Sequence, residues 1–522
     1  MALSPWIPAQ RQDALESNEL SDLDTRLLLQ PTASVEGTYS FNRSMSSRFM
    51  CVAGTAAAWA LALTGLIGGI YCATKLTSDP RSSDQQRFDT HIQGAILPHF
   101  YPLLLNIVIT AILDLTGFAH ATSLKWALQR EGRLSLNSNL RLLTTARSST
   151  PNKWYFNLAM LLASISAYAA SSLIFYVQKE YRSATGNTYE YTLSIIPMPV
   201  IWVGVSMLVI ASVTTFILLT TTVPTWSSHP LDTVRACLDN ASLEWVPGRC
   251  MLGVHSAKQP AEPTRPSTRQ SSMWSANLEA RRIVAGLWAL TGAILVASIV
   301  LVSLKAACRL EYCRDLQWSL VPAGNAPVVR VGTNTGYDMG TMAWKIVLFS
   351  AIQGLVTLAL HCAELIVNTS RDEHLWRLAS STPRGCKIQG YNSIWYACTN
   401  WQTIVLFLFK PIAHWFFGLA VSTNFGLQIY AEQTLYLSLV VALLAVFATA
   451  ISLYRPRGPQ PAAYGHLQTL SNLVDEWAGT LHWGHKTDGK VCHAGTSSSP
   501  LPPVNMDALY EGRYTIFPVI GD

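Results

Sequence analysis

Charged residues are scarce in this chain of 522 amino acids: they make up 13% of it, while half of the chain is hydrophobic. Ordinary soluble domains carry roughly 25% charged residues. The apolar residues are gathered in long runs, and a helix needs about 20 such residues to cross a hydrocarbon layer about 30 Å thick. The scarcity of charge and the length of the runs therefore exclude an ordinary soluble protein and indicate a polytopic membrane protein.

Several familiar sequence signals are absent. The first 49 residues contain no short apolar stretch ahead of a small-residue cleavage site, so we expect no signal peptide. The motifs of zinc peptidases, P-loop proteins, serine hydrolases and dinucleotide-binding proteins are also missing. We therefore expect no cofactor, and the sequence favours a protein that is not an enzyme.

Eight apolar runs predict membrane-spanning helices. Because the runs are continuous and do not alternate with polar residues, they exclude a transmembrane barrel. The expected fold class is all-α, a polytopic helix bundle of about eight spans. The runs lie at residues 50–73, 95–118, 154–177, 193–223, 283–304, 343–367, 403–422 and 433–453.

The segments outside the spans have different characters. Residues 1–49 predict a disordered tail, and the loop at 224–282 predicts partial disorder, with a flexible linker near 259–272. The transmembrane domain covers 50–453, and 454–522 form a C-terminal tail. Apolar residues at helical spacing predict a helix at 465–477, and a β-hairpin is predicted at 481–496 with Asp488-Gly489 at its turn. We expect both to lie under the transmembrane domain.

The positions of lysine and arginine predict the orientation. With the N-terminus in the cytosol, 26 of the 37 basic residues lie on the cytosolic side and nine on the opposite side. Cytosolic loops carry such an excess of basic residues. Both termini are therefore predicted to be cytosolic, in a membrane of the secretory pathway such as the plasma membrane or the endosome or vacuole.

Two short signals depend on this orientation. Asp24, Leu28 and Leu29 in the N-terminal tail resemble an acidic dileucine sorting signal, although a solvated tail without a signal is the commoner meaning of so short a pattern. Cys308 and Cys313 lie just outside the fifth span on the predicted oxidising side. They form either a local disulfide or two free thiols.

The segment after the second span is basic and periodic. Leu124 and Leu128 alternate with Lys125 and Arg130, as expected for an amphipathic helix lying on the inner leaflet. The alternative is a loop that only follows the general excess of basic residues in the cytosol.

Small residues mark two helix faces for close packing. Gly65 and Gly69 are one turn apart in the first span, and the third span has one small residue per turn at Ala159, Ala163, Ala167 and Ser171. We expect partners within the same chain, with a second protomer or another protein as the alternative. The lipid bilayer is the remaining expected partner, and no nucleic-acid partner is expected.

Ionisable residues within spans are the strongest pointers to function, because each costs about 2.5–3.5 kcal/mol at the bilayer centre. At a rise of about 1.5 Å per residue they share one layer of the bilayer, roughly 5–10 Å from the cytosolic boundary. One interpretation is a polar site or proton relay in which a carboxylate neutralises the lysine. The other, favoured by the sequence, is that the carboxylates reach the headgroups and the lysine snorkels toward them. The residues are Asp114, His361, Glu364, Lys410 and His414.

Four residues of the predicted hairpin, His482, His485, Cys492 and His493, are of metal-binding types. Their spacing is not a standard ligand pattern, and adjacent residues of a strand point to opposite faces. We therefore expect no metal site.

Four stretches are together similar to a group of fungal multipass integral membrane proteins without a characterised activity. They are SLKWALQREGRLSLNSNLRLL (123–143), TWSSHPLDT (225–233), LHCAELIVNTSRDEHLWR (360–377) and YGHLQTLSNLVDEW (464–477). The resemblance extends over most of the chain from residue 50 onward. It implies a fungal source and a multipass architecture, and it brings no catalytic or binding residues.

Three functions are compatible with these features. The sequence favours a non-enzymatic scaffold, sensor or partner-binding protein, because no catalytic motif is present and the cytosolic segments are structured. The alternative is a transporter or channel that uses the polar layer in the inner half of the bundle. A membrane enzyme is the third, and it would need histidines and carboxylates that converge on one cavity.

Overall fold

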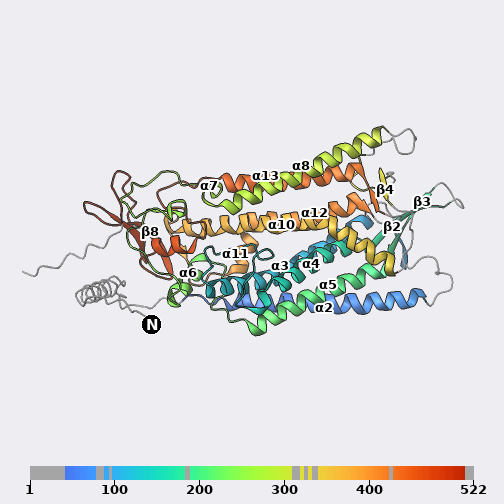
Figure 1. Cartoon of the computed structure of the whole chain (residues 1–522), viewed down its shortest axis with the longest axis horizontal. Helices are drawn as coiled ribbons and strands as arrows, with labels where there is room; N and C mark the ends of the chain where they lie inside the picture. The colour runs from blue at the N-terminus through green and yellow to red at the C-terminus, as the bar shows by residue number, and fades with distance from the viewer. Residues whose placement is uncertain are drawn as a thin grey trace, which may run out of the picture.

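The computed structural model describes residues 41–77, 88–92, 97–182, 188–307, 318–322, 327–331, 339–422 and 427–511. In this part of the chain eight long helices run side by side along the length of the molecule (Figure 1). Each coincides with one predicted span, so the predicted all-α bundle is confirmed. The helices are α2 (Met45–Thr77), α3 (Tyr101–Arg130), α4 (Trp154–Ser171), α5 (Pro197–Thr220), α8 (Leu278–Ala306), α10 (Met339–Ser381), α12 (Trp401–Ala420) and α13 (Ala431–Leu453).

The surface of the bundle is suited to lipid. Seven of the eight helices are long and apolar enough to cross a membrane; α4, with 18 residues, is the one not counted among them. Large apolar side chains along the helices are exposed, as Val296, Ile299 and Val300 of α8 show. Soluble proteins rarely expose apolar patches of this extent. The protein is therefore an integral membrane protein whose helices contact the bilayer.

Exposed aromatic residues mark the two boundaries of the apolar zone. Phe49 near the start of α2 and Tyr71 near its end are 69% and 59% exposed. The stretch between them is about 33 Å long at a rise of about 1.5 Å per residue, close to the thickness of a hydrocarbon core. Trp154 and Trp401, at the starts of α4 and α12, are similarly exposed, as expected for residues at a membrane interface.

The small-residue faces are occupied within the chain. A Cβ added at Gly65 would lie 3.0 Å from the Cα of Gly204 on α5, and one added at Gly69 would lie 2.6 Å from the side chain of Ile201. On α4, Ala167 and Ser171 are fully buried. The expectation of partners within the same chain is confirmed for these faces, because the close approach that glycine permits is used between α2 and α5.

Two small antiparallel sheets lie at the end of the bundle where α2 and α8 finish, and the sequence did not predict them. The first has the order β1-β3-β2, from β1 (Phe88–Ile92), β2 (Phe175–Arg182) and β3 (Thr188–Ile195). The second joins β4 (Val329–Val331), β7 (Leu427–Ile429) and β6 (Val421–Ser422) in the order β4-β7-β6. A 3₁₀ helix, η2 (Leu97–Phe100), precedes α3.

These sheets correct two span boundaries. The third span was predicted to reach residue 177, but α4 ends at Ser171 and Phe175 already pairs with Ile195 across β2 and β3. The fourth was predicted from 193, but α5 begins at Pro197 because proline fits the first turn of a helix and cannot continue the ladder of β3. An apolar run alone does not distinguish the helix from the adjoining strand.

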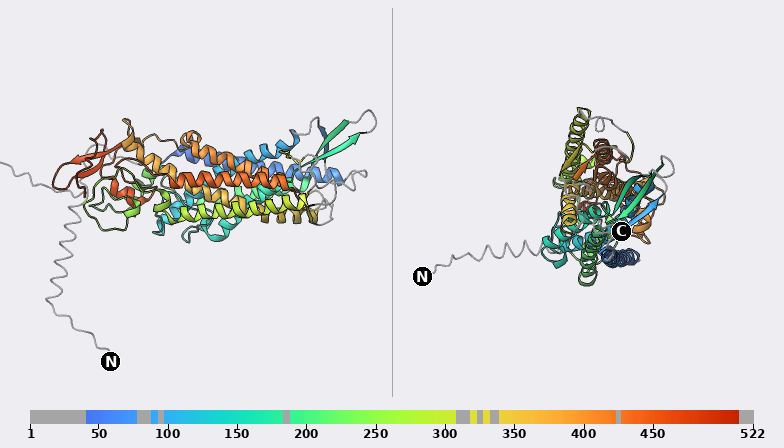
Figure 2. Two further views of the ribbon diagram at one scale, coloured as in Figure 1. Left: turned by 90° about the horizontal axis from the view of Figure 1, so that it is seen from above. Right: turned by 90° about the vertical axis from the view of Figure 1, so that its right-hand side faces the viewer.

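The other end of the bundle is covered by a layer that we call the end layer, formed by residues 134–153, 225–272, 382–399 and 454–511 (Figures 1 and 2). It contains helices α6 (Pro230–Asp239), α11 (Ser393–Thr399) and α14 (Leu467–Leu473), and the short η3 (Thr150–Asn152) and η4 (Val254–Ser256), while α7 (Met273–Ala276) joins it to α8. Strand β5 (Cys386–Lys387) pairs with β8 (Thr480–Thr487), which pairs with β9 (His493–Ser497). The predicted C-terminal helix and hairpin are thus confirmed.

The end layer has a hydrophobic core of its own. Trp126 at the end of α3 and Trp376 on the extended α10 are fully buried there, in one hydrophobic cluster with Leu470 of α14 and Trp483 of β8. Helix α10 continues 14 residues beyond the predicted end of its span, at residue 367, and so enters this layer. Residues 264 and 269, in the segment predicted as a linker, pair with residues 510 and 457.

One interpretation of the basic segment after the second span is wrong. Helix α3 continues to Arg130, and Leu124 and Leu128 are 0% and 2% exposed. They lie inside the protein because the end layer covers them. No amphipathic helix lies on the membrane surface at these residues.

Candidate functional site

The ionisable residues of three spans meet inside the bundle. Lys410 of α12 donates a hydrogen bond to Asp114 of α3 at 2.5 Å and another to Glu364 of α10. The second carboxylate oxygen of Glu364 lies 3.8 Å from Nε of Arg141, which comes from the loop between α3 and α4. Two cations thus face two carboxylates, so the group is balanced in charge, as a low-dielectric interior requires.

The interpretation that the sequence favoured, a snorkelling lysine, is wrong. Lys410 is 5% exposed, and its ammonium group is bound to both carboxylates within the bundle. Of the three side chains, Asp114 is the most accessible, at 32%. Pro411, next to Lys410, lies inside α12 and cannot donate to the backbone carbonyl four residues earlier.

The two histidines occupy adjacent levels. His361 Nδ1 lies 3.4 Å from both Glu364 Oε1 and Arg141 Nη2, so His361 belongs to the charged group. His414 is one turn further along α12 from Lys410. Its ring stacks on that of Tyr168 with centroids 3.7 Å apart, and its Nδ1 is 2.7 Å from the amide nitrogen of Gln353.

Polar contacts continue from His414 toward the end of the bundle that carries the two small sheets. The hydroxyl groups of Tyr168 and Thr110 are 2.8 Å apart, and Ser171 donates to the side-chain oxygen of Asn106 at 2.6 Å. Helices α3, α4, α10 and α12 therefore enclose a row of buried and partly buried polar side chains, which we call the polar column. It comprises Asn106, Thr110, Asp114, Tyr168, Ser171, Gln353, His361, Glu364, Lys410 and His414.

Arg141 closes the column on the side of the end layer. Its guanidinium group fills a notch at Gly117 of α3, where an added Cβ would lie 2.5 Å from the guanidinium carbon. Close by in sequence, His120 Nε2 is 2.9 Å from the side-chain oxygen of Asn157 on α4. Sequence reasoning missed Arg141 because it lies in a loop, and its only signal was the basic character of that loop.

Three buried side chains in and beside the column have polar atoms without a hydrogen-bond partner among the described residues: Asn106 Nδ2, Gln353 Oε1 and His120 Nδ1. Asn106, Gln353 and His120 are each 0% exposed. An unsatisfied buried group costs about 1–3 kcal/mol, and such groups are usually satisfied by ordered water. The column is therefore suited to bind ordered water molecules.

A cavity of about 60 Å³ adjoins the end of the column near Asn106. The walls of this cavity are formed by the same helices as the column. Pro102 of α3 lies one turn from Asn106, and Gly418 of α12 lies one turn from His414. Ser172 directly follows Ser171. The cavity has room for a few water molecules. The cavity is lined by His99, Pro102, Ser172, Phe175, Trp415, Gly418 and Leu419.

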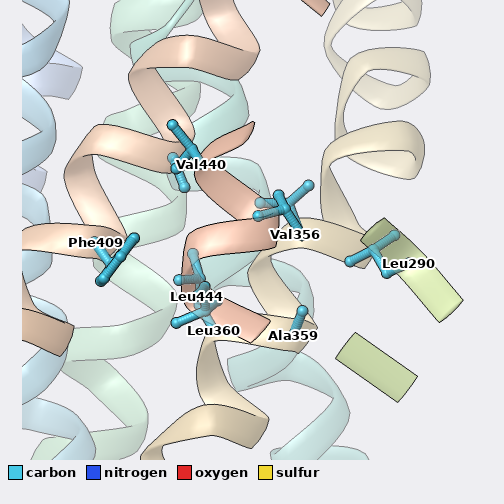
Figure 3. Close-up of a pocket in the computed structure, with 9 residues that line it drawn as sticks. Leu290, Val356, Ala359, Leu360, Phe409, Val440 and Leu444 are labelled. Atoms are coloured by element: carbon cyan, nitrogen blue, oxygen red, sulfur yellow. The ribbon is translucent and has the colours of Figure 1, made fainter. Parts of the chain in front are cut away.

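A second gap in the bundle is apolar and lies off the column. It is bounded by residues of α8, α10, α12 and α13 such as Leu290, Val356 and Phe409 (Figure 3). The space there is too small for a water molecule. It is a packing defect of the core and offers no polar group to a ligand.

The end layer contains a separate polar junction. Lys125 donates to Asn137 at 3.1 Å and to Thr233 at 3.0 Å, and the Asn137 amide donates to Asp372 at 3.0 Å. Gly465, with φ of +70°, approaches Asp372 so closely that an added Cβ would lie 2.6 Å from its carboxylate. The four stretches on which the family resemblance rests thus meet at one place, which ties the end layer to the bundle.

The remaining candidate residues are not tested by the structure. Asp24, Leu28 and Leu29 of the sorting signal lie outside the described residues, as do Cys308 and Cys313.

Comparison with known proteins returned no matching family model, no matching curated protein and no matching solved structure.

Proposed function

We propose that this integral membrane protein is a transporter or channel in which protons pass along the polar column. The observation that carries the proposal is the set of unsatisfied atoms on Asn106 and Gln353, in the same row as the Lys410 ion pairs, and on His120 beside that row. Ionisable residues at membrane depth are costly and mark ion and proton pathways. Carboxylates, imidazoles and hydroxyl groups can each pass a proton to a neighbour or to a bridging water.

The dimensions of the column favour protons over larger solutes. The cavity beside it holds about 60 Å³, whereas pockets for small organic ligands measure about 300–1,000 Å³. His414 is in direct contact with Tyr168 and Gln353, and Lys410 with Asp114. A proton can move through such a row by exchange between hydrogen-bonded groups, without a pore that passes a solute.

The proposed direction follows from the charge distribution of the chain. With 26 basic residues on the side of the end layer, that side is proposed to be cytosolic and the small sheets to face the opposite compartment. The cavity near His99 would then admit protons from that compartment, and Arg141 would separate the column from the cytosol. The membrane is proposed to belong to the secretory pathway, in an organism of the fungal group described above.

The variant Gln353→Leu tests the proposal. It keeps a side chain of similar size but removes the amide that contacts His414 and offers the unsatisfied oxygen. In liposomes loaded with a pH-sensitive dye and given a pH gradient, we expect the wild-type protein to accelerate equilibration and Gln353→Leu to slow it at least tenfold.

The matched control is Thr291→Val. Thr291 is a buried polar residue of α8 whose hydroxyl group donates to the backbone of its own helix, and it lies outside the column. This variant is expected to keep the wild-type rate. A wild-type protein that is folded in liposomes and no faster than protein-free vesicles would contradict the proposal.

A non-enzymatic scaffold or sensor is the second candidate. The observation that favours it is the end layer, which has a separate hydrophobic core around Trp376 and Trp483. Absence of proton flux in a well-folded sample, together with binding of a partner to the end layer, would support this function in place of transport.

A further inference from the structure

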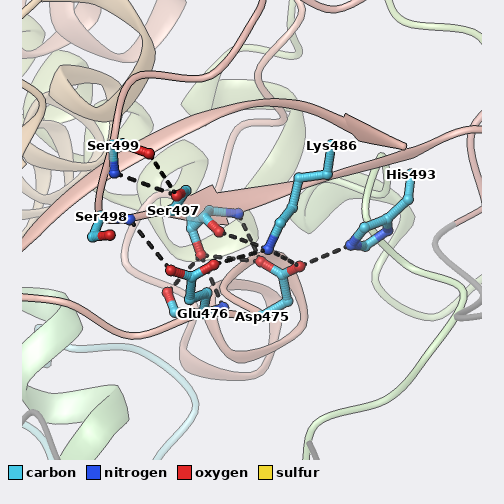
Figure 4. Close-up of polar contacts among 8 residues, drawn as sticks. Asp475, Glu476, Lys486, His493, Ser497, Ser498 and Ser499 are labelled. Atoms are coloured by element: carbon cyan, nitrogen blue, oxygen red, sulfur yellow. Dashed lines mark hydrogen bonds and ion pairs between the residues drawn. The ribbon is translucent and has the colours of Figure 1, made fainter. Parts of the chain in front are cut away.

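The hairpin of the end layer separates the four residues that the sequence analysis considered as metal ligands. His493 Nε2 is 2.8 Å from Asp475, which also receives hydrogen bonds from Lys486 at 3.0 Å and from the amide of Thr496 at 2.7 Å (Figure 4). Burial alone would raise the pKa of Asp475, but these donors hold that pKa well below its usual range. His493 is thus bound to Asp475, and His482 is buried against Gly385.

His485 and Cys492 instead come together at the turn, where they are joined by Asp488. One ligand atom of each residue lies within 4.8 Å of the other two, and His485 Nε2 is 3.2 Å from Asp488 Oδ1. A bulge between His485 and Thr487 shifts the register of β8 against β9. Bulges re-aim side chains, and this one explains why strand spacing did not predict the group.

The imidazole of His485 is held in place from its other side. Its Nδ1 is 2.8 Å from the hydroxyl group of Tyr510, which is 1% exposed and also accepts from the amide of Asn505 at 3.0 Å. When Nδ1 carries the proton and donates to Tyr510, Nε2 is free to bind a cation. Histidines that bind metals commonly have such a partner on the second nitrogen.

We propose that His485, Asp488 and Cys492 bind a divalent transition-metal ion of the zinc class, independently of the polar column. One nitrogen, one oxygen and one sulfur ligand suit zinc, which takes ligands at about 2.0–2.3 Å. Tetrahedral binding requires the ligand atoms to approach to roughly 3.4 Å of one another. Asp488, which is 95% exposed at the turn, supplies this movement. The Cys492 thiol releases its proton to solvent as the sulfur–metal bond forms, and water takes the fourth position.

The experiment is a titration of the purified full-length protein with Co²⁺, which replaces zinc and absorbs light when a thiolate binds it. We expect a thiolate-to-cobalt charge-transfer band that saturates at one ion per chain and disappears when Zn²⁺ is added. Cys492→Ser is expected to abolish the band, and Asp488→Asn to weaken cobalt binding at least tenfold.

Cys398→Ser is the matched control, because Cys398 is an exposed free cysteine of α11 outside the group. It should leave the band unchanged. Tyr510→Phe should weaken binding about tenfold through the loss of the partner on Nδ1. The proposal is overturned if the wild-type protein gives no band, or if Cys492→Ser keeps it. Asp488→Asn alters only an exposed side chain, so we expect this variant to fold as the wild type does. Its weaker cobalt binding would therefore report on the site and not on a loss of folding.

Discussion

Replacing Lys410 with methionine is expected to lower the melting temperature of the purified protein in detergent strongly. The substitution leaves Asp114 and Glu364 inside the bundle with Arg141 as their single counter-charge. Breaking a buried ion pair by removing one partner costs about 3–5 kcal/mol, because the remaining charge stays buried. That cost is a large part of the stability of most proteins.

The double variant Lys410→Met with Asp114→Asn shows whether the loss of stability comes from the unbalanced charge or from the changed volume of the side chain. It restores the balance, since Glu364 keeps Arg141 and no second carboxylate remains. We expect it to recover most of the melting temperature that the single variant loses. Lys387→Met, at an exposed lysine of the end layer, serves as the control and should melt as the wild type does. A single Lys410→Met variant that melts with the wild type would show that the ion pairs contribute little.

Trp376→Ala is expected to detach the end layer from the bundle. Trp376 is fully buried where α10 enters the layer, and its indole N–H donates to the backbone of Pro461 at 2.9 Å. Truncating a buried tryptophan costs about 3–5 kcal/mol. Hydrogen exchange should therefore become fast in β8 and β9 while the spans stay protected.

The matched control is Trp395→Ala in α11. Trp395 is 71% exposed, so its removal creates no cavity, and we expect hydrogen exchange in β8 and β9 to stay slow. Equal protection of β8 and β9 in Trp376→Ala and the wild type would mean that the end layer is held by other contacts, such as the junction around Asn137 and Asp372.

The helices could be predicted because a bilayer demands long apolar runs, and the run containing Lys410 was visible despite its charge. The depth of Lys410, Asp114 and Glu364 was also predictable, since residues on different helices share a layer when their distances from a boundary agree. Their contact was one of two interpretations, and the sequence could not decide between them. The contact depends on the rotation of each helix about its axis, and that is set by packing against neighbours such as Gly65 on Gly204.

Other parts of the site carry no signal in a single sequence. Asn106 and Gln353 are uncharged, so they do not interrupt an apolar run strongly enough to stand out, and Arg141 lies outside the spans. Strand β2 was hidden because Phe175 to Val177 are as apolar as the helix before them. The grouping of His485, Asp488 and Cys492 at the hairpin turn was not predictable, because a bulge breaks the alternation of the strand.

The measurement that tests the polar column most directly is a cryo-electron microscopy map of the protein in lipid nanodiscs, at a resolution that shows ordered water. We expect water density within hydrogen-bond distance of Asn106 Nδ2, Gln353 Oε1 and His120 Nδ1, continuing into the cavity beside Ser172. A column without water, in which these three atoms bond to neighbouring protein groups, would contradict a proton pathway and leave the ion pairs of Lys410 as structural contacts alone.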